Sequence, residues 1–156
     1  MSTTMRHWIF VRHAHPISAW SRWASTPLIV VPLWSRRSWT ALPIAVWMLI
    51  NPIITPPVSN DRSFATRAIL GEEQWIADPV KRGDLVAINA VGAAGLVIAG
   101  VAAWWRRPLP MVVAIAGSMV VVLLTWRRYA DFYDSRLTAD PLEPAGAHPG
   151  IAARQR

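Results

Sequence analysis

Six polar residues with side chains suited to ligand binding stand beside the apolar segments of this 156-residue sequence: Arg12, His13, His15, Asn51, Glu72 and Asn89. All six fall near the same expected end of four apolar segments. One hypothesis is therefore a polar binding pocket at the membrane surface. A simpler interpretation is that Asn51 and Asn89 join helices, by bonding to each other or to a carbonyl freed near Pro52.

The two histidines also raise the question of a metal site, because neutral imidazole is a common metal ligand. His13 and His15 could converge on an extended segment, and Pro16 favours that conformation around His15. Pairs of this kind arise often by chance, so we expect solvated or headgroup-contacting histidines, and no metal or other cofactor.

Other catalytic signatures are missing from the sequence. No Ser/His/Asp order, phosphate-binding glycine loop or HExxH pattern is found. The absence of Cys excludes disulfides, iron–sulfur clusters and a thiol nucleophile. The sequence therefore favours a non-enzymatic protein over an enzyme.

The elements that must position the polar residues are long apolar segments, in a chain with 53% hydrophobic and 16% charged residues. Uncharged stretches bounded by Trp and Arg pairs are typical of transmembrane helices. We predict an all-α integral membrane protein built from two antiparallel transmembrane helical hairpins. The spans are expected at about 20–34, 40–55, 84–105 and 109–126. The first reaches only about 22 Å, so it is either short or re-entrant.

Two further segments have the apolar spacing of amphipathic helices that lie in the headgroup region. They are residues 63–77 and 127–137, the second continuing the last span. We expect a single transmembrane domain over 1–137. The Pro-, Ala- and Gly-rich tail, 138–156, is expected to be disordered.

The distribution of Lys and Arg predicts the orientation. Twelve fall on the side expected to hold both termini, and four on the other side. The twelve are Arg6, Arg12, Arg22, Arg62, Arg67, Lys81, Arg82, Arg127, Arg128, Arg136, Arg154 and Arg156. This bias favours a multi-pass protein of the cytoplasmic membrane with both termini in the cytoplasm. The net charge is +7, but the sequence contains no nucleic-acid-binding motif. We therefore expect no nucleic-acid partner.

The third span carries small residues at every fourth position. Gly95, Ala99 and Ala103 form a stripe that allows a second helix to approach closely, and Ala114 and Ser118 of the fourth span could face it. Packing within the hairpin is the simplest interpretation. Contact with a second copy or with a membrane protein partner is the alternative.

Residues 12–76 resemble a family of small, uncharacterised bacterial and archaeal multi-spanning membrane proteins. The resemblance rests on Arg12–Arg22, on Asn51–Pro57 and on Ala68–Trp75, which are similar to the RHANPxSxWxR, NPxxFPPP and VLGExxW patterns of that family. His15 stands where the family has Asn, and Thr55 where it has an aromatic residue. The resemblance implies the multi-spanning architecture and no activity.

The sequence is compatible with three functions. The first is a non-enzymatic membrane protein that acts by packing against itself or a membrane partner. The second is a small lipid- or isoprenoid-modifying enzyme with a headgroup-level site. The third is an oligomeric channel or transporter of an uncharged solute. A proton-coupled pump is disfavoured, because the last three spans contain no ionisable residue in their interiors.

Overall fold

The computed structural model describes residues 10–77 and 83–139, and this part of the chain is helical and contains no β-strand. The prediction of an all-α protein is therefore confirmed. The elements are α2 (Pro16–Ser25), η1 (Thr26–Val30), α3 (Val31–Ser35), η2 (Ser38–Thr40), α4 (Ala41–Ile54), α5 (Phe64–Ala77), α6 (Gly83–Trp104) and α7 (Pro108–Ala139). The expected tail lies outside the described residues, apart from 138–139, which belong to α7.

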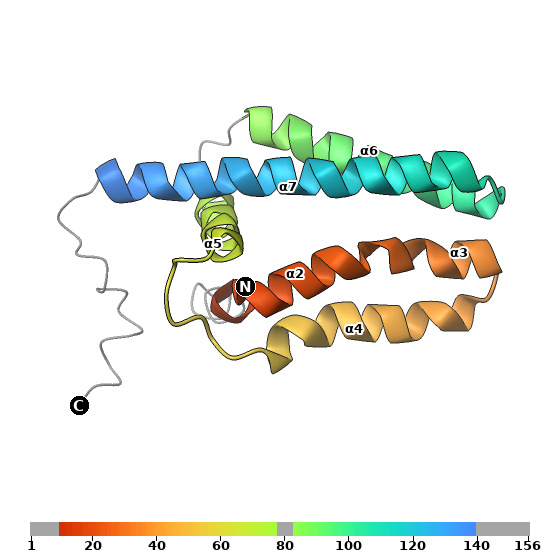
Figure 1. Cartoon of the computed structure of the whole chain (residues 1–156), viewed down its shortest axis with the longest axis horizontal. Helices are drawn as coiled ribbons and strands as arrows, with labels where there is room; N and C mark the ends of the chain where they lie inside the picture. The colour runs from red at the N-terminus through yellow and green to blue at the C-terminus, as the bar shows by residue number, and fades with distance from the viewer. Residues whose placement is uncertain (1–9, 78–82, 140–156) are drawn as a thin grey trace.

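Two antiparallel hairpins lie one above the other in Figure 1. One is formed by α6 and α7, and the other by the α2–η1–α3 arm and α4. Helix α5 joins them and lies crosswise under the C-terminal part of α7. Both hairpin turns are at one end of the molecule, whereas α5, the start of α2 and the end of α7 are at the other end.

The first arm is a helix interrupted by prolines. Pro27 and Pro32 lack the backbone N–H that a regular α-helix needs, and the chain passes through the 3₁₀ turn η1 between α2 and α3. The arm ends at Arg36, whose φ of 53° is left-handed and reverses the chain toward α4. The segment expected to be the first span is therefore a bent helical arm.

The second hairpin closes in a similar way. Arg106 also adopts a left-handed φ, of 54°. Its N–H bonds to the Ala103 carbonyl, and the Arg107 N–H bonds to the Ala102 carbonyl at 2.8 Å, which is the Schellman pattern of a helix C-terminus. Pro108 then starts α7, where its missing N–H costs nothing.

The small-residue stripe of α6 packs against α7. Ala99 and Ala103 are fully buried and share a core cluster with Ile115. A Cβ added at Gly95 would come within 2.2 Å of the Ser118 hydroxyl, so the glycine allows the close approach of the two helices. The stripe is thus occupied within this chain.

Helix α5 packs on α7 through an equally close contact. A Cβ at Gly71 would lie 2.0 Å from the Tyr129 carbonyl oxygen. Ala65 and Ala68 are also fully buried in the cluster that joins α5 to α7 and to the start of α2. The Thr66 hydroxyl donates to the Ala14 carbonyl at 2.8 Å, which fixes α5 to the segment before α2.

The outer surfaces of the long helices are apolar. Among the described residues, α6 and α7 are the two helices long and apolar enough to cross a membrane. Only 17% and 22% of their most apolar stretches are buried, whereas the core helix of a soluble protein would be mostly buried. Helix α4 is apolar but shorter. It too exposes large side chains, such as Leu42 and Leu49.

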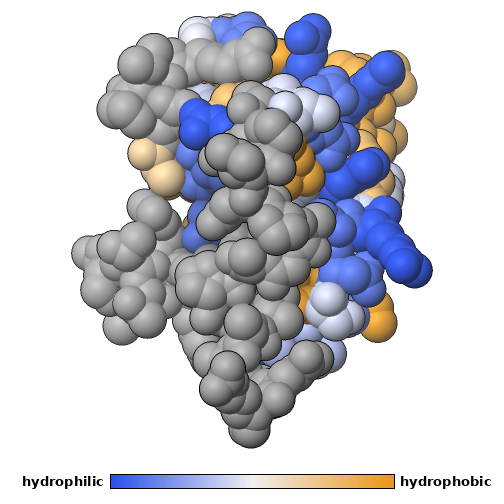
Figure 2. Space-filling view, turned by 90° about the vertical axis from the view of Figure 1, so that its left-hand side faces the viewer, coloured by the Kyte–Doolittle hydropathy of each residue, from blue (hydrophilic) through white to orange (hydrophobic). Residues whose placement is uncertain are grey.

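Hydrophilic residues gather at the end of the molecule that holds α5. Figure 2 views this end, and hydrophilic side chains make up much of its described surface, with apolar residues toward the rim. The other end carries Arg36, Arg37, Arg106 and Arg107, and the helices between the two ends expose large apolar side chains.

Candidate functional site

A pocket of about 410 Å³ lies between the two hairpins, near the α5 end. Side chains from both hairpins and from α5 line it. Polar groups of His13, Arg22, Thr26, Glu72, Asn89, Thr125 and Tyr129 contribute to the lining. The rest is mainly apolar, from Ala19, Trp23, Ile29, Met48, Ile69, Gly92, Ala93, Leu96, Val121, Val122 and Trp126. Its volume falls within the range of small-molecule sites.

The most closely joined pair in the pocket is Arg22 and His13. The guanidinium Nη1 of Arg22 lies 2.7 Å from His13 Nε2 and also contacts Nδ1. Arg22 projects from α2, whereas His13 belongs to the helical turn that precedes it. The backbone of His15 is extended and Pro16 starts α2 directly after it, so the chain turns between His13 and the helix that carries Arg22.

Burial of the imidazole and then the neighbouring Arg22 charge lower the pKa of His13 to about 4. His13 is therefore neutral at physiological pH and can accept a hydrogen bond from Arg22. Burial raises the pKa of Glu72, and the positive charge of Arg22 opposes that shift. The pocket thus combines a guanidinium, a neutral imidazole and a carboxyl group with a weakened tendency to ionise.

Asn89 and Tyr129 complete the polar part of the lining. The Asn89 amide donates to the Tyr129 hydroxyl oxygen at 2.9 Å. Tyr129 is 2% exposed, and its ring lies 5.7 Å from that of Trp75. Because its oxygen accepts from Asn89, the Tyr129 O–H remains as a donor.

Half of the residues that the sequence placed in the candidate site line this pocket, namely His13, Glu72 and Asn89. Arg12 instead donates to the carbonyls of Ile53 and Thr55. It anchors the helical turn before α2 to the end of α4. His15 caps α2, since its Nδ1 accepts from the Ile17 N–H at 3.3 Å. Those two side chains have structural contacts away from the pocket.

Asn51 is buried between α4 and α2. Its Oδ1 accepts from the Ser18 hydroxyl and its Nδ2 donates to the Ser21 hydroxyl, both at 2.8 Å. Asn51 and Asn89 therefore do not bond to each other, which was one of the two contacts considered for them. Two serines on the facing helix satisfy the first amide, and a tyrosine satisfies the second.

Two pocket residues were missed by the sequence reading. Arg22 counts there only among the cations that predict the orientation, and Tyr129 falls within the segment 127–137 that is expected to be an amphipathic helix. A lone charge inside an apolar segment was the available signal for Arg22, because such charges are rare without a partner. No sequence signal paired Tyr129 with Asn89, 40 positions earlier.

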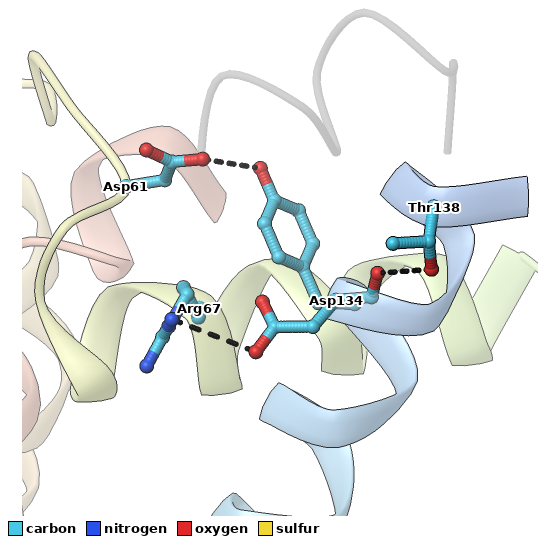
Figure 3. Close-up of polar contacts among 5 residues, drawn as sticks. Asp61, Arg67, Asp134 and Thr138 are labelled. Atoms are coloured by element: carbon cyan, nitrogen blue, oxygen red, sulfur yellow. Dashed lines mark hydrogen bonds and ion pairs between the residues drawn. The ribbon is translucent and has the colours of Figure 1, made fainter. Parts of the chain in front are cut away.

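A second polar cluster joins the segment before α5, α5 itself and the end of α7 (Figure 3). Arg67 forms an ion pair with Asp134 at 3.5 Å, and the Tyr133 hydroxyl donates to Asp61 at 3.4 Å. Burial, with the nearby Asp61 carboxylate, raises the pKa of Tyr133 to about 12. These contacts fasten the connection before α5 to the end of α7, so their role is structural.

Comparisons with protein-family models, with curated proteins and with solved structures found no match to this chain.

Proposed function

We propose that this chain is a multi-pass protein of the cytoplasmic membrane that binds a membrane amphiphile in the pocket between its hairpins. Four segments would cross the bilayer, namely the α2–α3 arm, α4, α6 and the first two-thirds of α7. The end that carries α5 would face the cytoplasm. The bilayer would then contact the apolar helix surfaces, and the hairpin turns would lie on the opposite side.

The two-part lining of the pocket is the observation that carries the binding proposal. Its polar groups include His13, Arg22 and Glu72, which lie at the α5 end of the hairpins. Leu96 and Val121 lie deeper, within the apolar stretches of α6 and α7. A lipid has the same division between headgroup and chain. A water-soluble ligand would leave the apolar part of the lining unmatched.

Packing against a partner through the small-residue stripe is less well supported. Gly95, Ala99 and Ala103 already face α7 within this chain. That surface offers little to another helix. The proposal therefore keeps the expectation of a non-enzymatic membrane protein but assigns its activity to the pocket.

Native mass spectrometry of the full chain, purified in mild detergent, tests the proposal. The wild type should retain about one lipid per chain. Ala93→Phe introduces a large side chain into the pocket lining and should reduce retention several-fold. Ala94→Phe places the same group on the next, exposed position of α6, outside the pocket, and should leave retention unchanged.

Two results would count against this function. One is a wild-type protein that retains no lipid. The other is an Ala93→Phe protein that retains as much as the wild type and the Ala94→Phe control.

One observation favours a lipid-modifying enzyme as the second candidate. A neutral imidazole inside a ligand pocket can act as a general base, and His13 is such a group. Conversion of a total lipid extract by the purified protein would support this candidate if His13→Gln abolished turnover and left the amount of folded protein unchanged. Equal turnover by both proteins would exclude His13 as the base.

A further inference from the structure

We infer that the amphiphile bound in this pocket has an anionic phosphate headgroup, and that Arg22 is the residue that holds it. The inference rests on the proposed binding of an amphiphile. It adds the chemical class of the headgroup and the side chains that recognise it.

The guanidinium of Arg22 is only partly used within the protein. Its Nη1 contacts His13, but its Nε is buried and has no hydrogen-bond partner. A buried N–H without an acceptor is unfavourable, and most such groups in proteins are paired. Because Arg22 lines the pocket, an anionic oxygen that enters beside its guanidinium could accept from it, as phosphate accepts from Arg.

A second donor lines the same pocket. The Tyr129 oxygen already accepts from Asn89, so its O–H is left to donate. Arg22 and Tyr129 thus offer two donors from different helices, α2 and α7. These two donors, one of which belongs to a positively charged guanidinium, suit a headgroup oxygen that carries negative charge.

The charge balance of the lining agrees with an anion. Among the residues that the structure describes, Arg22 is the only Lys or Arg that lines the pocket, and Glu72 is the only acidic residue. His13 is neutral, as described above. The Glu72 carboxyl prefers its protonated form more than an exposed carboxyl does, since burial disfavours the charge. The acid therefore opposes a bound anion less than a fully ionised carboxylate would.

Equilibrium titration of the detergent-purified chain with matched lipids tests the inference. Dioleoyl phosphatidate and dioleoylglycerol share their chains and differ by the phosphate. At about 150 mM salt, which screens surface adsorption, phosphatidate should bind about tenfold more tightly or better. Arg22→Gln should weaken phosphatidate binding until the two lipids bind about equally.

Three variants make the result specific. Arg127→Gln removes the same charge from an exposed site at the same end of the molecule and should change phosphatidate binding less than twofold. Glu72→Gln removes a repulsive charge and should strengthen phosphatidate binding. Tyr129→Phe removes a donor, keeps the ring, and should weaken it several-fold, so the inference remains testable if Arg22→Gln fails to fold.

The outcomes separate this inference from the proposed function. Equal affinity for the two lipids, insensitive to Arg22→Gln, would overturn the phosphate headgroup and leave amphiphile binding intact. Failure of both lipids to bind would overturn amphiphile binding itself. Displacement of phosphatidate by inorganic phosphate of comparable affinity would identify a site for the free anion, and that result would also overturn the lipid headgroup.

Discussion

Side chains of the same type have different roles in this structure, and their roles depend on their position in the fold. His13 and His15 are two positions apart, yet one lines a pocket and the other caps a helix. The difference follows from Pro16, which starts α2 directly after His15. His13 therefore contacts Arg22, and His15 lies at the N-terminus of α2.

The titration of His13 follows from its surroundings. Its pKa in the folded protein is about 4, below the ordinary 6.5 of an imidazole, because burial and Arg22 both disfavour the charged form. The unfolded chain therefore takes up a proton first. The contribution of His13 to stability should be complete above about pH 6.5 and lost as the pH falls toward 4.

Nuclear magnetic resonance of ¹⁵N-labelled histidine can check this expectation. The His13 ring should remain neutral at pH 6 and titrate near pH 4. His13→Gln should remove that signal and reduce the loss of thermal stability between pH 6.5 and 4.5. A His13 titration midpoint near 6.5 would contradict the buried position.

Asn51 provides a second test at this scale. Its amide satisfies two hydroxyls between α2 and α4, and it is 2% exposed. Asn51→Leu should lower the free energy of unfolding by about 1–3 kcal/mol, since Ser18 and Ser21 lose their partner in apolar surroundings. Asn60→Ala, at an exposed position, should have a much smaller effect in the same denaturation assay. Equal losses of unfolding free energy in the two variants would show that Asn51 does not stabilise the contact between α2 and α4.

At the scale of the elements, close helix contacts determine where the pocket forms. Helix α5 carries Glu72 into the pocket only because the preceding residue, Gly71, lets its backbone approach α7. The carbonyl of Tyr129 lies at that contact, so the same approach brings Glu72 and Tyr129 to one pocket. Gly71 therefore controls the position of two lining residues at once.

Substitution of Gly71 should disrupt this arrangement. A Cβ there would lie 2.0 Å from backbone, which cannot move as a side-chain tip can. Gly71→Ala should lower the free energy of unfolding by about 1–3 kcal/mol. Gly117→Ala is the matched control, since a Cβ there meets open space, and it should be neutral or stabilising by up to about 1 kcal/mol. The measurement is reversible denaturation in mixed micelles, and equal effects of the two substitutions would contradict the close contact.

Much of the element pattern could be predicted from the sequence, because it depends on local properties. Uncharged runs and the prolines at 27, 32 and 108 predict where the long helices begin, bend and end. The meeting of Arg22 with His13, or of Asn89 with Tyr129, depends on how α5 lies across the hairpins. No local period encodes that placement, so three of the six expected site residues line the pocket and two of its important residues were missed.

At the scale of the whole molecule, the surface is divided into two polar ends and an apolar middle. The hairpin turns carry Arg36, Arg37, Arg106 and Arg107, and the opposite end carries the charged residues of α5 and of the end of α7. Helices this exposed and this apolar would aggregate in water. A bilayer would place its hydrocarbon core against the apolar middle and its headgroups and water against the polar ends.

The proposed four crossings can be distinguished from two by the side on which each turn is accessible. The chain contains no Cys, so single cysteines can be introduced without background. Ser38→Cys and Arg107→Cys report on the two hairpin turns, and Ser59→Cys reports on the exposed segment between α4 and α5. With four crossings, a membrane-impermeant maleimide should label Ser38→Cys and Arg107→Cys from outside the cell, and Ser59→Cys only in inverted vesicles.

A re-entrant first hairpin gives a different pattern. If the first hairpin were re-entrant and only α6 and α7 crossed the bilayer, Ser38→Cys would not label from outside the cell, and Arg107→Cys alone would do so. Labelling of Arg107→Cys only in inverted vesicles would instead reverse the orientation that the Lys and Arg distribution favours. The pocket would then open at the outer surface, and its amphiphile would come from the outer leaflet.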